Sequence, residues 1–515
     1  MSGFSVSRRD LLLAGGLGGL AAMTGCSDEP AGDADASMFA TLKQAAPPWG
    51  QLRRNVDGTL SLPGSTPYDR ARLLENPRYD WARPHAVLRV ANATDVATAF
   101  KFAQDHDLRV ALRSGGHSYP GWSAGGGGNT GPKALVLDCR GLSRVAVDGT
   151  RATIGAGASL AKVYDALGAR GRAIAGGSCA TVGIAGLTLG GGVGVLSRSM
   201  GLTCDQVVAM RVVTADGKIR TVDARHDPSL FWALRGGGGG HLGMVTAFTF
   251  ATQRAPEMSS FYLRWRFSAA ADLIDAWQDW APVADTRLWS TLKLLGGRGR
   301  PEPVLQVSGT WTGPASGLDA QLAGLLRHVP APITRTVQRQ SYRALMARYA
   351  GCADIPASQC HSGPGGKIVR ESFGATSHIG HKALDRDGAA DLIAQVRRAQ
   401  TNGLLVGGAS LDALGGRVRD LDDDATAFGH RRALMTVQYY GSWDGRSGSA
   451  GVADRYVRSV REAMKPHWGL HAYVNYADPT IKSYKTAYFR GNAARLATVR
   501  KKYDPHDFFR QPQGY

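Results

Sequence analysis

Three glycine-rich runs are the features that most restrict how this chain can fold. They read RSGGHSYPGWSAGGGG at residues 113–128, GGSCATVGIAGLTLGGGVG at 176–194 and WALRGGGGGHLGMVTAF at 232–248. Glycine adopts positive φ at little cost and has no side chain, so such runs let the backbone lie close against phosphates and a flat ring. Turns and bulges also use glycine, so the runs alone leave both readings open. The first two runs each contain one reactive side chain, His117 and Cys179.

The spacing within these runs excludes two common phosphate-binding loops. Residues 190–194 are not framed by a strand, a helix and a later ribose-binding acid in the order that a Rossmann fold requires. No GKS or GKT follows any run, which excludes a Walker-type loop. The sequence has no CxxC pair and no His/Cys cluster with zinc spacing, so we expect no metal site.

Length and hydrophobic patterning predict more than one domain. At 515 residues the chain is longer than a single core usually supports. Between residues 79 and 250, short apolar runs alternate with helical stretches, which is typical of α/β or α+β structure. From 259 to 443, strands with period-two alternation and helices with one apolar face predict an antiparallel sheet that is covered on one side. The tyrosine-rich segment 473–511 is again helical in pattern, so we expect the two ends of the chain to form one domain.

The N-terminus resembles a twin-arginine export signal. Arg8 and Arg9 precede an apolar stretch, residues 11–23, that is too short to span a bilayer. The stretch ends in Met-Thr-Gly-Cys26, which resembles a site where cysteine is lipidated after cleavage. A plain membrane anchor or a cleaved secretory peptide is the alternative reading. We expect a periplasmic or extracellular protein whose membrane contact is limited to the signal or to a lipid on Cys26.

The remaining cysteines and the net charge leave several questions open. A disulfide between Cys352 and Cys360, in GCADIPASQC, would close a short loop after export, but two unpaired thiols fit the spacing equally well. The net charge of +19 fits attraction to an anionic surface, and it also fits an arginine-rich surface without such a role. The sequence contains no nucleic-acid-reading motif, so nucleic acid is not an expected partner. Nothing in the sequence indicates the oligomeric state.

Four motifs in a fixed order resemble those of one enzyme family. RSGGHSY, GGSCATVGIAGLTLGGGVG, LFWALRGGGGGHLGMVT and the terminal YVNYAD with KKYDPHDFF resemble the berberine-bridge-enzyme-like branch of FAD-linked oxidases, in the vanillyl-alcohol-oxidase superfamily. Within it, the chain is similar to bicovalently flavinylated oligosaccharide oxidases and to aclacinomycin oxidoreductase. The resemblance covers residues 75–260 and 430–512, and the central part more loosely through GGRV and TAFGHR.

The resemblance implies an α+β fold with a PCMH-type FAD-binding domain made of two subdomains. The N- and C-terminal parts of the chain would form this domain, and an antiparallel sheet with helices would be inserted as the substrate domain. The expected divisions are a signal (1–26), a tether and N-terminal extension (27–74), the FAD-binding domain (75–255), the substrate-binding domain (256–450) and a C-terminal segment that completes the FAD domain (451–515).

Transferred residue by residue, the resemblance implies FAD bound by two covalent bonds. His117 matches the histidine bonded to the flavin 8α carbon, and Cys179 matches the cysteine bonded at the 6-position. Taken singly, His117 is more often a turn histidine and Cys179 a buried thiol. The further residues that match cofactor contacts are Arg113, Ser114, Gly115, Gly116, Ser118, Val182, Gly183, Gly186, Gly190, Val245, Tyr473 and Asn475.

A flavin-dependent alcohol oxidation also needs a base that takes the hydroxyl proton. Tyr476 matches the tyrosine that serves as base in carbohydrate-oxidising relatives, and Tyr439 or Tyr440 is a candidate helper. A free tyrosine has a pKa of about 10, so the base must be tuned by its neighbours. Aromatic packing is the alternative role for the terminal tyrosines. For Arg198 and Asp205 we expect a structural salt bridge.

Three further positions distinguish this chain within the family pattern. Val182 matches a gate beside the flavin, where valine or isoleucine resembles the oxidases, so the resemblance implies O2 as acceptor and H2O2 as product. His241 stands where the family usually has asparagine, which puts one cofactor contact in doubt. Gly429 replaces proline in TAFGHR, the motif that ends at Arg431.

The expected enzyme is an oxidase that acts on the CH–OH group of a saccharide or a glycosylated metabolite. A natural-product tailoring oxidase that closes a ring is the alternative, and a low-turnover surface binding protein is the alternative of another class. Six central tryptophans are candidates for stacking on sugars, although core packing is the commoner role. They are Trp265, Trp277, Trp280, Trp289, Trp311 and Trp443.

Overall fold

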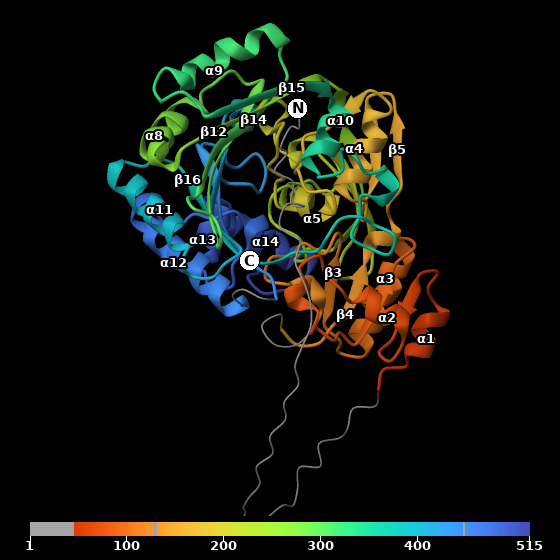
Figure 1. Ribbon diagram of the computed structural model, residues 1–515. Coiled ribbons are helices and arrows are strands. Elements are labelled where there is room, and N and C mark those ends of the chain that lie inside the picture. The colour runs from red at the N-terminus through yellow and green to blue at the C-terminus, as the bar shows by residue number, and fades with distance from the viewer. Residues whose placement is uncertain (1–45, 127–130, 446–448) are drawn as a thin grey trace, which may run out of the picture.

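A computed structural model of the protein describes residues 46–126, 131–445 and 449–515 (Figure 1). The expected export signal, Cys26 and residues 27–45 of the expected tether and N-terminal extension lie outside these residues. Within the described ranges, no helix combines the length and the apolar character needed to cross a bilayer.

The first sheet is small and mostly parallel. Its elements are α1 (Trp49–Arg54), β1 (Thr59–Ser61), α2 (Thr66–Ala71), β2 (Ala86–Arg89), α3 (Ala93–Asp105), β3 (Val110–Arg113) and β4 (Leu135–Asp138). Strands lie in the order β1-β2-β4-β3, and only β1 is antiparallel to its neighbour. Helix α3 supplies the crossover that parallel strands require, and the Asn92 side chain caps its first turn. Because β1 pairs with β2, the expected N-terminal extension is partly built into this sheet.

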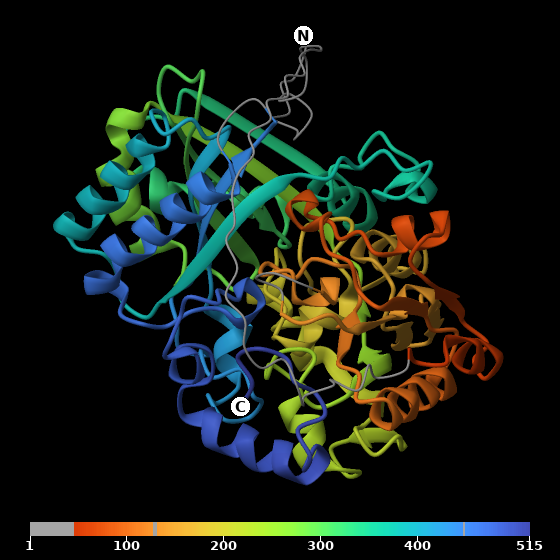
Figure 2. The same ribbon diagram turned by 90° about the horizontal axis from the view of Figure 1, so that it is seen from below.

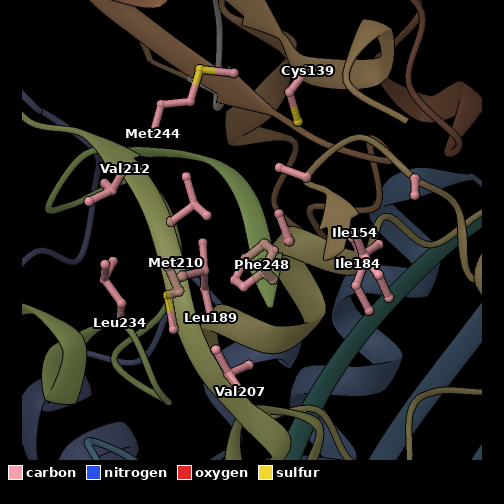
Figure 3. Packing of buried hydrophobic residues seen from close by; sticks show 14 of the residues in the cluster. Cys139, Ile154, Ile184, Leu189, Val207, Met210, Val212, Leu234, Met244 and Phe248 are labelled. Carbon is pink, nitrogen blue, oxygen red and sulfur yellow. The ribbon is translucent and has the colours of Figure 1, made fainter. Parts of the chain in front are cut away.

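The second sheet is antiparallel and has five strands. Its region contains β5 (Val145–Asp148), β6 (Arg151–Gly155), α4 (Leu160–Gly168), β7 (Arg172–Ala173), α5 (Ile184–Leu189), α6 (Ser197–Met200), β8 (Val207–Val213), β9 (Ile219–Asp223), α7 (Pro228–Ala233), β10 (Met244–Ala251) and β11 (Gln253–Arg254). The strand order is β5-β6-β10-β8-β9, and β7 pairs separately with β11. Met210, Val212 and Phe248 point from β8 and β10 into the core (Figure 3).

The central part of the chain forms a seven-stranded antiparallel sheet. Its elements are β12 (Glu257–Trp265), α8 (Ala270–Trp280), β13 (Leu288–Gly296), β14 (Val304–Trp311), α9 (Leu318–Leu326), β15 (Thr334–Ser341), α10 (Tyr342–Tyr349), β16 (Ser372–Gly380), α11 (Arg386–Arg398), β17 (Val406–Ala413), β18 (Met435–Trp443) and α12 (Ala450–Trp468). The strand order is β15-β12-β14-β13-β17-β18-β16. Helices α8, α9, α11 and α12 cover one face, which we call the helix face (Figures 1 and 2).

Helix α12 lies in a different unit from the one that the expected domain division gave it. Its residues Tyr456, Val460 and Met464 are buried in the core of the seven-stranded sheet. The helix therefore lies with the central sheet, although the division at 450 placed it in the C-terminal segment. An amphipathic helix shows that one face is buried, but its sequence does not show which sheet covers that face.

One hydrophobic core joins the two ends of the chain. It contains Leu52 and Phe100 from the first part and Tyr488 and Phe509 from the last. The last part holds a 3-10 turn at Val474–Tyr476, α13 (Tyr484–Phe489) and α14 (Ala493–Tyr503). Figure 2 shows these C-terminal helices beside the N-terminal half of the molecule. The expectation that the two ends form one unit around an inserted central sheet is confirmed.

A disulfide closes a loop at the boundary between the two units. Cys352 and Cys360 are bonded, which resolves the two readings left open by their spacing. Both cysteines pack with Ala180, which lies between Cys179 and Thr181. The disulfide-closed loop therefore packs against the second glycine-rich run next to Cys179.

Candidate active site

The loop after β3 begins with a buried arginine. Arg113 is 1% exposed, and its guanidinium donates to the carbonyl oxygens of Ser123 at 2.9 Å and Ala71 at 2.5 Å. Its Nη1 lies 3.9 Å from the Asp138 carboxylate. The side chain is thus occupied within the fold, and it holds the loop in place. Arg113 was expected to contact the diphosphate of the cofactor. Because its side chain is used in these contacts, only its backbone could do so.

The first two glycine-rich runs lie against each other. A Cβ added to Gly115 would lie 2.2 Å from the backbone nitrogen of Gly183, and one added to Gly183 would meet Ser114 Oγ at 2.0 Å. Ser114 Oγ donates to the Ala156 carbonyl at 2.6 Å, and Gly116 has a φ of +77°. Only glycine permits this approach, which brings the loops that carry His117 and Cys179 together.

A direct hydrogen bond also links the loops that carry the two expected attachment residues. His117 Nε2 lies 2.8 Å from Thr181 Oγ1, two residues beyond Cys179. His117 and Cys179 are both half-buried, and Cys179 is a free thiol. The other candidates vary in their exposure. Ser118 Oγ accepts from Trp122 N at 3.1 Å, Val182 is half-buried and Val245 is 3% exposed within β10.

The C-terminal segment clamps the end of the second glycine-rich run. Tyr473 OH accepts hydrogen bonds from the backbone N–H groups of Gly192 at 2.9 Å and Val193 at 3.2 Å. Asn475 Nδ2 donates to the Leu187 carbonyl at 2.9 Å, and a Cβ on Gly190 would lie 2.0 Å from Asn475 Oδ1. These two residues support the run through its backbone, and their expected contact with the cofactor stays a prediction.

Tyr476 lies where this segment meets the seven-stranded sheet. Its ring stacks on Tyr119, with centroids 5.1 Å apart, and Tyr119 OH accepts from Gln438 Nε2 on β18. Tyr473 contacts the same ring edge-on at 5.1 Å. Burial raises the pKa of the Tyr476 phenol well above its usual value, and the neighbouring acidic groups of Tyr119, Asp412, Tyr473 and Cys179 add to this shift. The phenol is therefore protonated at neutral pH.

The face of the sheet opposite the helix face, here called the inner face, carries polar side chains. Asp412 on β17 pairs in register with Thr291 on β13, and Thr291 Oγ1 lies 3.2 Å from Ser410 Oγ. Burial raises the pKa of the Asp412 carboxyl, although hydrogen bonds from Thr291 and Ser410 and the charge of Lys293 oppose the shift. Ser410, Asp412 and Lys293 are half-buried and Thr291 is buried, so this face is only partly covered.

The two candidate helper tyrosines lie on opposite faces of β18. Tyr439 is 0% exposed in the core of the helix face, and its hydroxyl is 2.8 Å from His378 Nδ1. The expectation that Tyr439 assists catalysis is therefore wrong, because strand residues alternate and this one points away from Tyr476. Tyr440 lies on the inner face, where its ring stacks on Phe373 at 5.2 Å.

The expected salt bridge forms at Asp205 but not at Arg198. Asp205 forms a bidentate pair with Arg431, with both N···O distances at 2.7 Å. Arg198 donates to the carbonyl oxygens of Leu288 at 2.7 Å and Pro282 at 2.7 Å, which ties α6 to the central sheet. The family-pattern arginine at the end of TAFGHR is thus the partner of Asp205.

The remaining expectations concern the central tryptophans and His241. Trp265, Trp277 and Trp311 are buried in the core of the helix face, and Trp280 and Trp443 are partly buried against it. Trp289 is buried in the other core, which the two ends of the chain share, so core packing is confirmed for all four buried tryptophans. His241 is 4% exposed and its ring lies 5.0 Å from that of Tyr515. Its departure from the family pattern is therefore accommodated by packing against the C-terminal residue.

Sequence reasoning missed three residues of this site: Tyr119, Asp412 and Gln438. Tyr119 was visible as the aromatic residue two positions after His117 in the same motif. Asp412 and Gln438 are polar residues that alternate with apolar ones on their strands, a pattern that marks the more polar face of a sheet. Their convergence on Tyr476 depends on strand register and was not readable from the sequence.

Comparisons with known proteins agree with this geometry. Residues 84–223 match the FAD binding domain family, and residues 472–514 match the family of berberine and berberine-like proteins. The uncharacterized FAD-linked oxidoreductase YgaK of Bacillus subtilis is 30% identical over 458 residues, which cover 85% of this chain and 95% of the relative. The chain belongs to the berberine-bridge-enzyme-like family of FAD-linked oxidoreductases.

Solved structures give the same result for the fold. BBE-like 1 of Physcomitrella patens is 26% identical with a TM-score of 0.81, and the match covers 90% of this chain and 98% of that chain. The glucooligosaccharide oxidase of Acremonium strictum is 26% identical with a TM-score of 0.77, over 89% of this chain and 98% of that one. The expected α+β fold class and FAD-linked oxidoreductase class are thereby confirmed.

Proposed function

We propose that the protein is an exported FAD-dependent oxidase that acts on an alcohol or hemiacetal carbon of a saccharide or glycosylated metabolite. Dioxygen is the electron acceptor and hydrogen peroxide the second product. One observation carries this proposal: the Tyr476 ring stacks on Tyr119, two residues after His117, and the Tyr119 hydroxyl accepts a hydrogen bond from Gln438 on the inner face. The proposed base is therefore linked both to the loop of the proposed attachment point and to the polar face of the sheet.

FAD fits the residues that surround this point. The backbones of the two glycine-rich runs touch at Gly115 and Gly183, and nothing lies within 4 Å of the Cβ position of Gly186 on α5. We assign the covalent bonds to His117 and Cys179. The glucooligosaccharide oxidase structure is described as holding 6-S-cysteinyl, 8α-N1-histidyl FAD, which supports the same pair of bonds here. When bound, FAD supplies a hydride acceptor.

In the proposed reaction the chain's own residues handle the proton. Tyr476 accepts the hydroxyl proton of the substrate, and its phenol proton passes to Asp412. A carboxylate whose pKa is raised by burial suits this acceptor role, because it holds a proton more readily than an exposed aspartate. Tyr119, held by Gln438, fixes the Tyr476 ring by stacking.

The inner face favours a substrate with many hydroxyl groups. In register, Ser410 lies beside Lys293, Lys293 beside Gln306 and Gln306 beside Arg264, which gives a row of hydrogen-bonding side chains across four strands. A row of donors and acceptors suits a saccharide better than an apolar polycyclic compound, since each buried polar group needs a partner. Val182 is the residue that we assign to oxygen access.

A substrate panel read by peroxide formation tests the function. Oligosaccharides and glycosides should bleach the flavin without oxygen and release peroxide in air. A product that has lost two hydrogens without ring closure supports simple oxidation, whereas a cyclised product supports a tailoring oxidase. Saccharide binding without flavin bleaching would instead identify a binding protein.

A further inference from the structure

We propose that the inner face selects an acidic saccharide, and that Arg264 and Lys293 are the residues that bind its anionic groups. This assignment rests on the proposed oxidation of a saccharide, and it names the substrate class of that same site. Both are specificity-determining residues, because they contact parts of the substrate away from the reacting carbon.

Arg264 and Lys293 are half-buried cations of the inner face that form no ion pair within the described ranges. Arg264 lies on β12 and Lys293 on β13, and both side chains are only partly exposed. Neither has a carboxylate oxygen of a described residue within 4.0 Å, and Arg264 Nε is buried without a hydrogen-bond partner among these residues. A charge that is partly removed from water is stabilised by an opposite charge or by hydrogen bonds. An anionic group on the substrate would provide both.

The inner face carries more positive than negative charge. Strand alternation places Arg264, Lys293 and Asp412 on this face, and no other charged residue lies at an inner-face position of β12, β13, β14, β17 or β18. Asp412 is the residue that we assign to proton transfer beside Tyr476. The part of the face that remains for the rest of the substrate is therefore positively charged.

The two cations lie on one line with neutral hydrogen-bonding side chains. From β12 to β18, the order of residues in register is Arg264, Gln306, Lys293, Ser410 and Gln438. Gln438 holds the tyrosine that stacks on the proposed base. Neighbouring strands are about 4.8 Å apart, so the Lys293 backbone lies about 10 Å from that of Gln438, and the Arg264 backbone about 19 Å. A saccharide that reacts beside Gln438 therefore reaches Lys293 and then Arg264 with residues further along its chain.

This order of side chains suits an acidic oligosaccharide. Arg and Lys form charge-assisted hydrogen bonds with carboxylates and with phosphate-like anions, which are roughly twice as strong as hydrogen bonds between neutral groups. Gln306 and Ser410 lie beside the cations and suit hydroxyl groups, since they donate and accept. A chain of uronic acids presents carboxylates and hydroxyls together. A sulfated or phosphorylated saccharide shares this chemistry.

Matched trisaccharides test the charge selectivity of the parental protein. Trisaccharides of galacturonate, glucuronate and mannuronate are each compared with their carboxyl-reduced, neutral forms, and kcat/KM is measured from peroxide formation. We expect at least one acidic form to be preferred by about tenfold or more at low salt. The preference should fall in about 300 mM NaCl, because salt screens the attraction between charges. A 6-O-sulfated form of each neutral trisaccharide distinguishes a carboxylate from an ester anion.

Glutamine variants test the two residues. Arg264→Gln and Lys293→Gln should each lower the ratio of kcat/KM for the acidic form to that for the neutral form by about tenfold. Arg264→Lys and Lys293→Arg should largely keep this ratio, because the charge remains. Arg335→Gln is the matched control and should leave the ratio unchanged. Arg335 lies opposite Leu263 on the neighbouring strand β15, so it points to the helix face, where it pairs with Asp319.

The outcomes separate this inference from the proposed function. Oxidation of the neutral trisaccharides at least as fast as the acidic ones overturns the inference and leaves the oxidase function in place. An unchanged ratio in both glutamine variants overturns the assignment to Arg264 and Lys293. Oxidation of neither form overturns the proposed saccharide oxidation, and the inference with it. Preference for the uronates alone supports a carboxylate, and equal preference for the sulfated forms supports a site for either anion.

Discussion

The phenol rings of Tyr119 and Tyr476 are parallel, with centroids 5.1 Å apart and an interplanar angle of 6°. Tyr119 belongs to the His117 loop and Tyr476 to the C-terminal segment, so the stack joins the two ends of the chain. The contact uses the ring faces and not the Tyr476 hydroxyl, to which we assign the proton transfer. The position of the proposed base is thereby coupled to the loop of an expected flavin attachment point.

Tyr476→Phe should keep bound FAD and slow flavin reduction by about a hundredfold or more, because a positioned general base is lost while the ring stack remains. Anaerobic stopped-flow reduction with a confirmed substrate measures the rate. Tyr119→Phe keeps the stack and the base and serves as control. Reduction of Tyr476→Phe at the parental rate would remove Tyr476 from the proposed role.

The flavin bonds are tested by denaturation. His117→Ala and Cys179→Ala should each retain yellow flavin in the acid-precipitated pellet, since one bond survives, and the double variant should release all of it. Mass spectrometry of flavin-linked peptides assigns each bond to its residue. Release of free FAD from the parental protein would contradict both assignments.

The buried Asp205–Arg431 pair should contribute strongly to stability. The side chains of Asp205 and Arg431 are 10% and 0% exposed, so Arg431→Ala leaves a poorly solvated carboxylate, and we expect a loss of about 3–5 kcal/mol in the free energy of unfolding. The adjacent Arg432 pairs with Asp422 at the surface, and Arg432→Ala should cost less than about 1 kcal/mol. Urea unfolding of the two variants measures the difference, and equal losses would refute it.

Stability should fall in acid partly because of His241. Burial, with a smaller effect of Arg500, lowers the pKa of His241 to about 3, whereas an unfolded histidine titrates near about 6.5. Below about pH 6.5 the unfolded chain therefore binds a proton that the folded chain does not, and stability is lost down to about pH 3. At pH 5 this group alone accounts for about 2 kcal/mol.

Urea unfolding at pH 7 and pH 5 tests the effect of His241. His241→Asn should reduce the difference between the two pH values, because its side chain does not titrate. His226→Asn, at an exposed position beside Asp223, should not reduce it. An unchanged pH dependence in His241→Asn would contradict the assignment.

Removal of the Cys352–Cys360 disulfide should destabilise the protein by about 2–3 kcal/mol, the loop-closure entropy expected for a short loop. The paired Cys352→Ser and Cys360→Ser variant, compared with the parent in denaturant, gives the value. Cys204→Ser, which alters a buried free thiol, separates the effect of the bond from that of losing a buried cysteine. Identical midpoints for the parent and the paired variant would show that the bond contributes nothing.

The motifs predicted the fold class because each one places glycines where backbones must touch. Gly115 and Gly183 illustrate this. No residue with a side chain fits at these positions, so the glycines in the sequence indicate the close contact between the two runs. The antiparallel sheet was equally readable, since period-two alternation reflects burial on one face.

The faces and partners of individual residues were not readable. Tyr439 and Tyr440 are neighbours in an alternating strand, so one must face the helices and the other the inner face, but register with β16 and β17 decides which. Asp205 forms its salt bridge with Arg431, which is far away in the sequence, and no local pattern relates the two positions. Helix α12 likewise has an apolar face whose partner is set by the sheet beside it.

The core shared by Leu52 and Phe509 constrains how the molecule is made. Strands β12 to β18 are synthesised before the segment that carries Tyr473 and Tyr476, so the central sheet can pair first. The cofactor-binding half closes only after that segment has been made. A chain shortened by premature termination or by carboxy-terminal proteolysis would keep its central sheet but leave the apolar surface under α14 open to aggregation.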